Sequence, residues 1–178
     1  MEKGKVIIGI DPDNKESGVG VVYSDKKVQT YKMEFPKLLD YLRYMNECCK
    51  TLKVVIEGGW LNKSNWHVLG KFMSTMKAAA IGRSAGMNHQ TGILITEWCK
   101  HNGIDCQVVK PLKKCWSGQD GKITQEEAKY FMGDQLPRMN QDQRDALLIA
   151  WVYAGLPVRV KPKKPTTTLQ KTVRAFDG

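Results

Sequence analysis

Two apolar stretches of this sequence each end on an acidic residue. Residues 6–10 read VIIGI and precede Asp11, and residues 53–56 read KVVI and precede Glu57. A buried, ionised carboxylate loses its hydration, so it needs a hydrogen-bonded partner, a cation or water. Asp11 could simply open a turn. Glu57, followed by two glycines, is harder to explain in that way, because Glu is a poor strand and turn residue.

A second pair of acids opens the last apolar segment, QDQRDALLIAWVYAG, at residues 141–155. Asp142 and Asp145 are three residues apart, so in a helix they are neighbours on one face. A negative charge at a helix N-terminus is stabilised by the helix dipole, which would account for Asp142 without a further role. That explanation is weaker for Asp145, which lies one turn deeper, beside the apolar residues 146–149.

The four acids together would be a metal site. If Asp11, Glu57, Asp142 and Asp145 meet, like charges this close cannot all stay ionised unaided. Mg²⁺ prefers carboxylate and water oxygens. Two divalent ions about 3.5–4 Å apart can activate a water and stabilise the leaving oxygen of a phosphodiester. The acids therefore predict a site for two Mg²⁺ or Mn²⁺ ions that hydrolyses phosphodiester bonds.

The elements that must position these acids follow from hydropathy and capping patterns. Strands are predicted over 5–11, 17–23, 26–33, 53–60 and 105–109. Helices are predicted from Pro36, over 64–81 and 84–102, from a capping box at Thr124 and Glu127, and from Asn140 to about Ala154. This order predicts an α/β fold with a five-stranded mixed sheet, three antiparallel strands followed by parallel ones, and helices on both faces.

Length and charge suggest one domain with a basic extension. The chain has 178 residues, which suits a single domain, here residues 1–156. Its 28 Lys and Arg exceed 18 Asp and Glu, for a net charge of +10, which favours a polyanionic partner such as nucleic acid. Half of that excess falls in the Pro-, Lys- and Thr-rich residues 157–178, which are predicted to be a flexible tail.

Cysteine usage and hydropathy indicate a cytoplasmic protein. The five cysteines are odd in number and form no Cys-x-x-Cys pair, which favours free thiols in a reducing compartment over a zinc site or a catalytic cysteine. The apolar runs are too short for a membrane span, and the first residues, MEKGKVIIGID, lack the arrangement of a signal peptide.

The motifs resemble a known family. IIGIDPDNKESGVGVV at residues 7–22, Glu57 after its strand, and QDQRDALLIAWVYAG are similar to the RuvC Holliday-junction resolvases of the RNase H-like superfamily. The resemblance covers about residues 5–155, with the same order of elements. It implies an RNase H-like fold and a crossover junction endodeoxyribonuclease that resolves four-way DNA junctions by paired symmetric nicks. It also implies a homodimer that uses divalent metal.

Carried over by motif, the resemblance assigns roles to particular residues. The four metal ligands fall on Asp11, Glu57, Asp142 and Asp145, and an aromatic that contacts bases at the junction centre matches Trp60, which could also be a packing residue. The segment GRSAGMN, 82–88, resembles part of the dimer interface. The expected DNA contacts are Trp60, Lys113, Lys114 and Lys122, with Lys63 in the polar loop after Trp60.

The sequence departs from the family in three ways. Asp13 stands where the family has glycine, which adds a fifth acid near the site. The basic tail and the cysteines are not family features. The role of Asp13 is left open by the sequence.

The same residues are compatible with other functions. One alternative is another RNase H-like nuclease that cuts flaps or RNA–DNA hybrids. A second is an actin-like ATP-binding protein, but those proteins need a second glycine-rich phosphate loop, which IEGGW at 56–60 does not match. A third is a non-catalytic DNA-binding module, against which the full set of acids argues.

Overall fold

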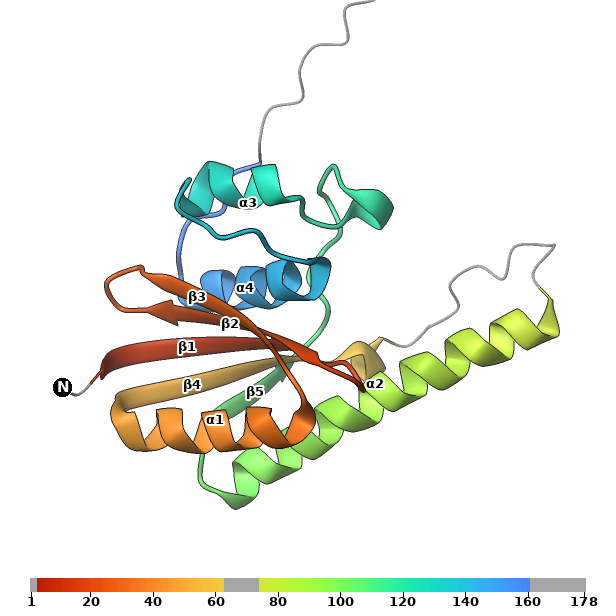
Figure 1. The fold of residues 1–178 in the computed structure, drawn as a ribbon, viewed down its shortest axis with the longest axis horizontal. Helices are drawn as coiled ribbons and strands as arrows, with labels where there is room; N and C mark the ends of the chain where they lie inside the picture. Colours follow the sequence, from red (N-terminus) through yellow and green to blue (C-terminus); the bar gives the residue numbers. More distant parts are fainter. Residues whose placement is uncertain (1–2, 63–73, 161–178) are drawn as a thin grey trace, which may run out of the picture.

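A single mixed β-sheet organises the chain. The structure is a computed structural model that describes residues 3–62 and 74–160 (Figure 1). Its strands pair in the order β3-β2-β1-β4-β5, with β1, β2 and β3 antiparallel and β1, β4 and β5 parallel, which confirms the predicted sheet. The strands are β1 (Lys3–Asp11), β2 (Ser17–Tyr23), β3 (Val28–Met33), β4 (Cys49–Glu57) and β5 (Cys106–Val109).

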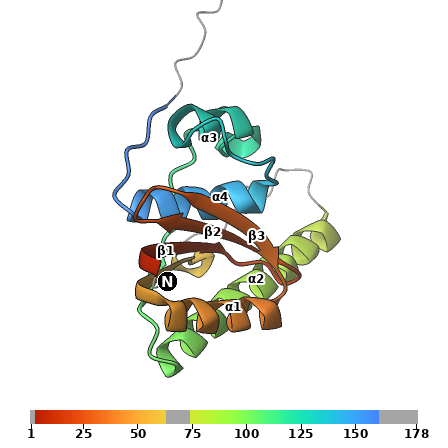
Figure 2. The ribbon, with the colours of Figure 1, turned by 60° about the vertical axis from the view of Figure 1, so that its left-hand side comes forward.

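Helices cover both faces of this sheet, as predicted. Helices α1 and α2 lie against one face, and α4 lies against the other with α3 beyond it (Figures 1 and 2). The predicted caps form, because Thr124 and Asn140 each make a capping box at the start of α3 and α4. The helices are α1 (Phe35–Cys48), α2 (Thr75–His101), α3 (Gln125–Met132) and α4 (Gln141–Tyr153), with 3₁₀ turns η1 (Gly59–Leu61) and η2 (Gln119–Gly121).

The helical prediction was wrong in one respect. Two helices were expected, over 64–81 and 84–102, but α2 is one continuous helix from Thr75 to His101, and residues 63–73 lie outside the described residues. Gly82 lies at the expected break without adopting a left-handed conformation. A single glycine costs a helix only about 1 kcal/mol, so neighbouring helix formers carry the helix through it.

The alternation of residues along β1 divides the core into two layers. Val6, Ile8 and Ile10 are buried in the layer that α1 and α2 cover. Ile7 lies in the layer under α4. Since side chains alternate along a strand, the side chains of Asp11 and Ile7 point to the same face of the sheet, which is the face that α4 covers.

Two glycines bring α4 unusually close to the sheet. A Cβ on Gly9 would overlap with backbone atoms of Ala146 and Ala150 in α4. A Cβ on Gly20 would overlap with the backbone of Leu147. At these two positions α4 therefore contacts β1 and β2 backbone against backbone.

The described helices include none with the length and apolarity that a membrane crossing would require. Of the expected tail, 157–178, only residues 157–160 fall within the described ranges, and they carry no helix or strand.

Candidate active site

Asp11 and Glu57 occupy equivalent positions on neighbouring parallel strands. The pairing of β1 with β4 ends at Ile10 opposite Ile56, so the next residue on each strand is the acid. Alternation places both side chains on the α4 side of the sheet, at the carboxyl ends of their strands. The two carboxylates predicted from separate strand ends are thus brought together.

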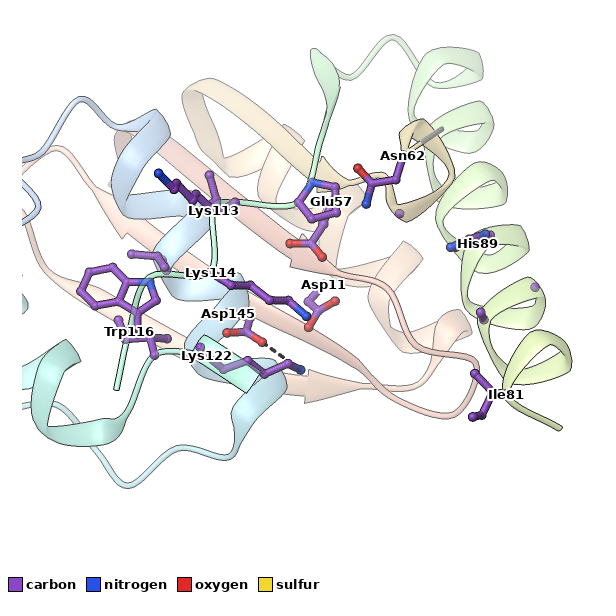
Figure 3. Close-up of a pocket in the computed structure, with 18 of the residues that line it drawn as sticks. Asp11, Glu57, Asn62, Ile81, His89, Lys113, Lys114, Trp116, Lys122 and Asp145 are labelled. Carbon is purple, nitrogen blue, oxygen red and sulfur yellow. Dashed lines mark ion pairs between the residues drawn. The ribbon is translucent and has the colours of Figure 1, made fainter. Parts of the chain in front are cut away.

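Asp145 joins them from α4. Asp11, Glu57 and Asp145 line one cavity of about 690 Å³, between α2 on one side and residues 111–123 on the other (Figure 3). The Asp145 side chain is 19% exposed.

Burial raises the pKa of all three acids, and repulsion by neighbouring acids adds to this at Asp11 and Glu57. Burial, followed by the charges of Glu57, Asp145 and Asp142, raises the pKa of Asp11 well above its ordinary value. Burial and Asp145 raise the pKa of Glu57. Burial also raises the pKa of Asp145, although a hydrogen bond from Gln141 and the charge of Lys122 oppose it. The ionised cluster is therefore unfavourable without added positive charge.

Lysines supply part of that charge. Lys122 Nζ lies 3.5 Å from Asp145 Oδ2 and lowers the pKa of all three acids. Lys114 lowers the pKa of Glu57. Figure 3 shows Lys114 and Lys122 reaching toward Asp11 and Asp145, whereas Lys113, which also lines the cavity, points away from the carboxylates. Lys63 lies outside the described residues.

Asp142 does not line this cavity. Its side chain is 39% exposed, twice the fraction of Asp145, and its Oδ2 lies 3.7 Å from Lys32 Nζ on β3. It occupies the first turn of α4, where the helix dipole favours an acid. Asp142 still adds to the negative charge felt by Asp11.

The donor set suits a divalent cation. Within residues 3–62 and 74–160, no side chain donates a hydrogen bond to the carboxylate of Asp11 or Glu57, and no three Asp, Glu, His or Cys side chains are arranged to hold one ion together. Carboxylates that are desolvated, like-charged and without donors are nevertheless what a hard cation such as Mg²⁺ or Mn²⁺ stabilises. Asp11, Glu57 and Asp145 offer oxygen atoms of the kind that such a cation takes, and all three line one cavity.

Asp13, whose role the sequence left open, organises the turn after β1. Its Oδ1 accepts hydrogen bonds from the backbone N–H groups of Lys15 and Glu16. Its Oδ2 accepts from Asn88 Nδ2 at 3.1 Å, while Asn88 Oδ1 accepts from the backbone N–H of Asn14. Asp13 thus fixes the turn and attaches it to α2.

Trp60 lies at the edge of the site and is half-buried. A Cβ on Gly92 would overlap the Trp60 ring, so the ring packs directly on α2. The ring also meets His89 edge-on, with centroids 6.1 Å apart. Trp60 and His89 line a smaller pocket together with Asp11 and Glu57. Trp60 is therefore both a packing residue and a wall of the site.

The cavity contains residues that sequence reasoning missed. These are His89 and Trp116. Trp116 stacks on Phe131, with ring centroids 5.7 Å apart. Neither has a local pattern that marks it, because His89 reaches the cavity through the packing of α2 and Trp116 through the packing of residues 111–123.

The small residues expected at a dimer interface also face this cavity. Gly82, Ala85 and Gly86 line its α2 wall. Nothing lies within 4 Å of a Cβ built on Gly82 or Gly86, so this part of α2 has open space around it.

The sheet order, with β2 antiparallel between β1 and β3 and acids at the ends of β1 and β4, defines an RNase H-like fold, as predicted. Two solved structures are similar: Thermus thermophilus RuvC in complex with a Holliday junction substrate (16% identity, TM-score 0.45) and Thermus thermophilus RuvC (17%, TM-score 0.43). Each alignment covers 84% of this chain, and 92% and 96% of those chains. No family model matches the sequence, and no curated protein matches it.

Proposed function

We propose that this chain is a divalent-metal-dependent endonuclease that cuts four-way DNA junctions. The observation that supports it most directly is the convergence of Asp11, Glu57 and Asp145 on one cavity, with no described donor to the first two and with lysines on the opposite wall. A structural role would leave these half-buried acids paired, whereas Asp11 and Glu57 have no described donor and burial raises the pKa of all three acids.

The proposed roles follow from position. Asp11, Glu57 and Asp145 hold two Mg²⁺ or Mn²⁺ ions, with Asp142 as a fourth ligand or as a source of negative charge nearby. When bound, such ions activate a water and stabilise the leaving oxygen of a phosphodiester. Lys114 and Lys122 orient the scissile phosphate at the cavity, and Lys113 and Lys63 contact phosphates beyond it.

Trp60 is proposed to contact the bases at the branch point. Its ring lines the small pocket beside Asp11 and Glu57, so a base that stacks there would lie next to the scissile phosphate. A stack on an aromatic side chain is sequence-tolerant, because every base has a π-face. That property suits an enzyme that selects a branched shape.

A second copy of the chain is the proposed partner of α2. Residues 75–84 of this helix are exposed, apart from the half-buried Ala78, and they project beyond the sheet (Figure 1). Met76 and Ile81 expose apolar surface there. A short helix without tertiary contacts is marginal in water, so a partner helix would stabilise it. A twofold dimer would present two sites to a near-symmetric junction.

The first experiment compares nucleic-acid substrates. A labelled four-way junction, a flap and an RNA–DNA hybrid are incubated with the protein in Mg²⁺, in Mn²⁺ or in EDTA. Paired cuts in junction strands of like polarity, dependent on metal, support the proposal. Preferred cleavage of flaps or hybrids would replace it with another RNase H-like nuclease, and absence of any cleavage would favour a DNA-binding module.

A second experiment counts the ions. Mn²⁺ binding, followed by electron paramagnetic resonance, should saturate at two ions per chain in the wild type, with weaker binding in a Glu57→Gln variant. Cellular fractionation would test the expected cytoplasmic location.

A further inference from the structure

Arg144 uses its whole guanidinium group to join three segments near the site. Nε donates to the carbonyl oxygen of Ile123 at 3.0 Å, and Nη1 donates to that of Met139 at 2.6 Å. Nη2 donates to Gln141 Oε1 at 2.7 Å. The planar guanidinium fixes these bonds in direction, which a lysine could not do.

The bond to Gln141 passes this constraint on to Asp145. Because Gln141 Oε1 accepts from Arg144, the amide is turned so that Nε2 donates to Asp145 Oδ1 at 2.7 Å. The same nitrogen lies 3.4 Å from the Ile123 carbonyl oxygen. Asp145 therefore has one oxygen held by Gln141, while the other, Oδ2, is 3.5 Å from Lys122.

The bond to Ile123 fixes the opposite wall of the cavity. The Ile123 side chain is buried in the core layer under α4, and Lys122 is its immediate neighbour. Arg144 thus holds the backbone beside Lys122 as well as the amide that orients Asp145. One side chain sets the position of both a carboxylate and a lysine that the proposed function uses.

We infer that Arg144, acting through Gln141 and the Ile123 carbonyl, is the positioning residue that sets the geometry between Asp145 and Lys122 for phosphodiester cleavage. Arg144 does not itself line the cavity. The inference rests on the proposed function for its catalytic consequence, but its structural part can be tested without any nuclease activity.

The test uses Arg144→Met, Arg144→Lys and Gln141→Met, with Arg138→Met as the matched control. Arg138 is an exposed arginine just before α4, so its loss removes the same charge without the guanidinium bonds. Loss of a partner that orients a metal ligand typically costs 10- to 100-fold in metal affinity or activity. We expect junction-cleavage kcat to fall about 10- to 100-fold in all three variants, with Arg144→Lys not rescuing, and junction Kd to stay within about twofold of the wild type.

Two further measurements separate positioning from other roles. Hydrogen exchange of residues 118–124 should speed up in Arg144→Met and not in Arg138→Met, and Mn²⁺ affinity should fall about 10-fold or more. Arg144→Met should also have a smaller effect on kcat in a Lys122→Met background, because the two changes act on the same geometry.

Specific results would overturn the inference. A weakened junction Kd with a smaller salt slope would make Arg144 a phosphate contact. A lower Tm with unchanged kcat for the folded fraction would make it a stabilising residue only, and unchanged exchange over 118–124 would remove the structural link. If the wild type cuts no nucleic acid while exchange and Mn²⁺ affinity change as expected, the proposed function fails and the positioning of Asp145 stands.

Discussion

Asn88 donates a hydrogen bond to Asp13 at 3.1 Å and so ties α2 to the turn that begins two residues after Asp11. The backbone of Asn14 returns a second bond to the same side chain. The wall of the cavity that carries His89 is therefore held to the strand that carries the central carboxylate. The bond to Asp13 is partly buried and the bond from Asn14 is exposed, and a hydrogen bond of this kind contributes about 0.5–1.5 kcal/mol.

Removing this attachment should loosen α2 without unfolding the sheet. We predict that Asn88→Ala lowers the Tm by about 2–8 °C. The two lost bonds stabilise the fold by about 1–2 kcal/mol, and each kcal/mol shifts the Tm of a chain of this size by about 2–4 °C. Hydrogen exchange should rise in α2 and in the turn at 13–17, and not in β4. Gln90→Ala, an exposed change on the same helix, is the control. Unchanged exchange at both segments would contradict the prediction.

The acidic cluster should cost stability when no metal is present. We predict that Asp11→Asn abolishes cleavage while leaving junction binding equal or tighter, because a negative group facing phosphates is lost. In EDTA the same variant should have a higher Tm than the wild type, because it removes a half-buried carboxylate that has no described donor. Added Mg²⁺ should raise the Tm of the wild type more than that of the variant.

The control for this prediction is Asp40→Asn, an exposed acid on α1 that pairs with Arg43. It should change neither cleavage nor the Mg²⁺-dependent Tm. If the double variant Asp11→Asn with Glu57→Gln still cleaves, these acids are not the active site.

Trp60 should matter both for stability and for junction cleavage. Trp60→Ala leaves a gap against Gly92 and should lower the Tm, and its loss of stacking, about 1–3 kcal/mol, should slow cleavage at least tenfold. Trp60→Phe should recover most of both. Trp98→Ala, on the same helix layer but under Arg43, should lower the Tm and leave cleavage by the folded protein unchanged. Normal cleavage by folded Trp60→Ala would reduce Trp60 to a packing residue.

Gly86, which also lines the cavity, offers a test of the proposed dimer. Because a Cβ there meets nothing within 4 Å, Gly86→Arg should fold as well as the wild type, and replacing a helical glycine can add about 1 kcal/mol. We predict a monomer by sedimentation that makes single nicks in place of paired cuts. The arginine is chosen because it does not repel phosphates. His101→Arg, at the exposed end of α2, is the control.

The dimer prediction has its own contrary outcome. A wild-type protein that sediments as a monomer even on junction DNA would leave a nuclease that cuts one strand at a time.

The parts of the site that lie on regular elements could be predicted from sequence, and the parts that depend on packing could not. Asp11 and Glu57 follow from strand ends, since parallel neighbours finish at the same edge of a sheet. The spacing along α4 correctly predicted that Asp142 and Asp145 are neighbours on one helix face. It could not predict where the first turn of the helix lies relative to the strands. That offset leaves Asp142 facing Lys32 on β3 while Asp145 enters the cavity.

Residues whose roles arise from long-range contacts carried no local signal. Arg144 looks like an ordinary charge in a helical first turn until Ile123 is packed beside it. The same holds for His89, which reaches the cavity through the packing of α2 beside the ends of β1 and β4. The expected break near Gly82 is also absent. Helix continuity there depends on a small difference in propensity, which a hydropathy pattern does not resolve.

The glycines under α4 make one side of this site inflexible. At Gly9 and Gly20 no side chain separates the strands from the backbone of α4, so no rotamer at these two positions can adjust the distance from α4, which carries Asp145, to the sheet. Adaptation to substrates of different width must therefore come from the other two walls, which are α2 and residues 111–123. We therefore expect sequence changes that alter the width of the cavity to accumulate in α2 and residues 111–123. The contact between α4 and the sheet should stay unchanged.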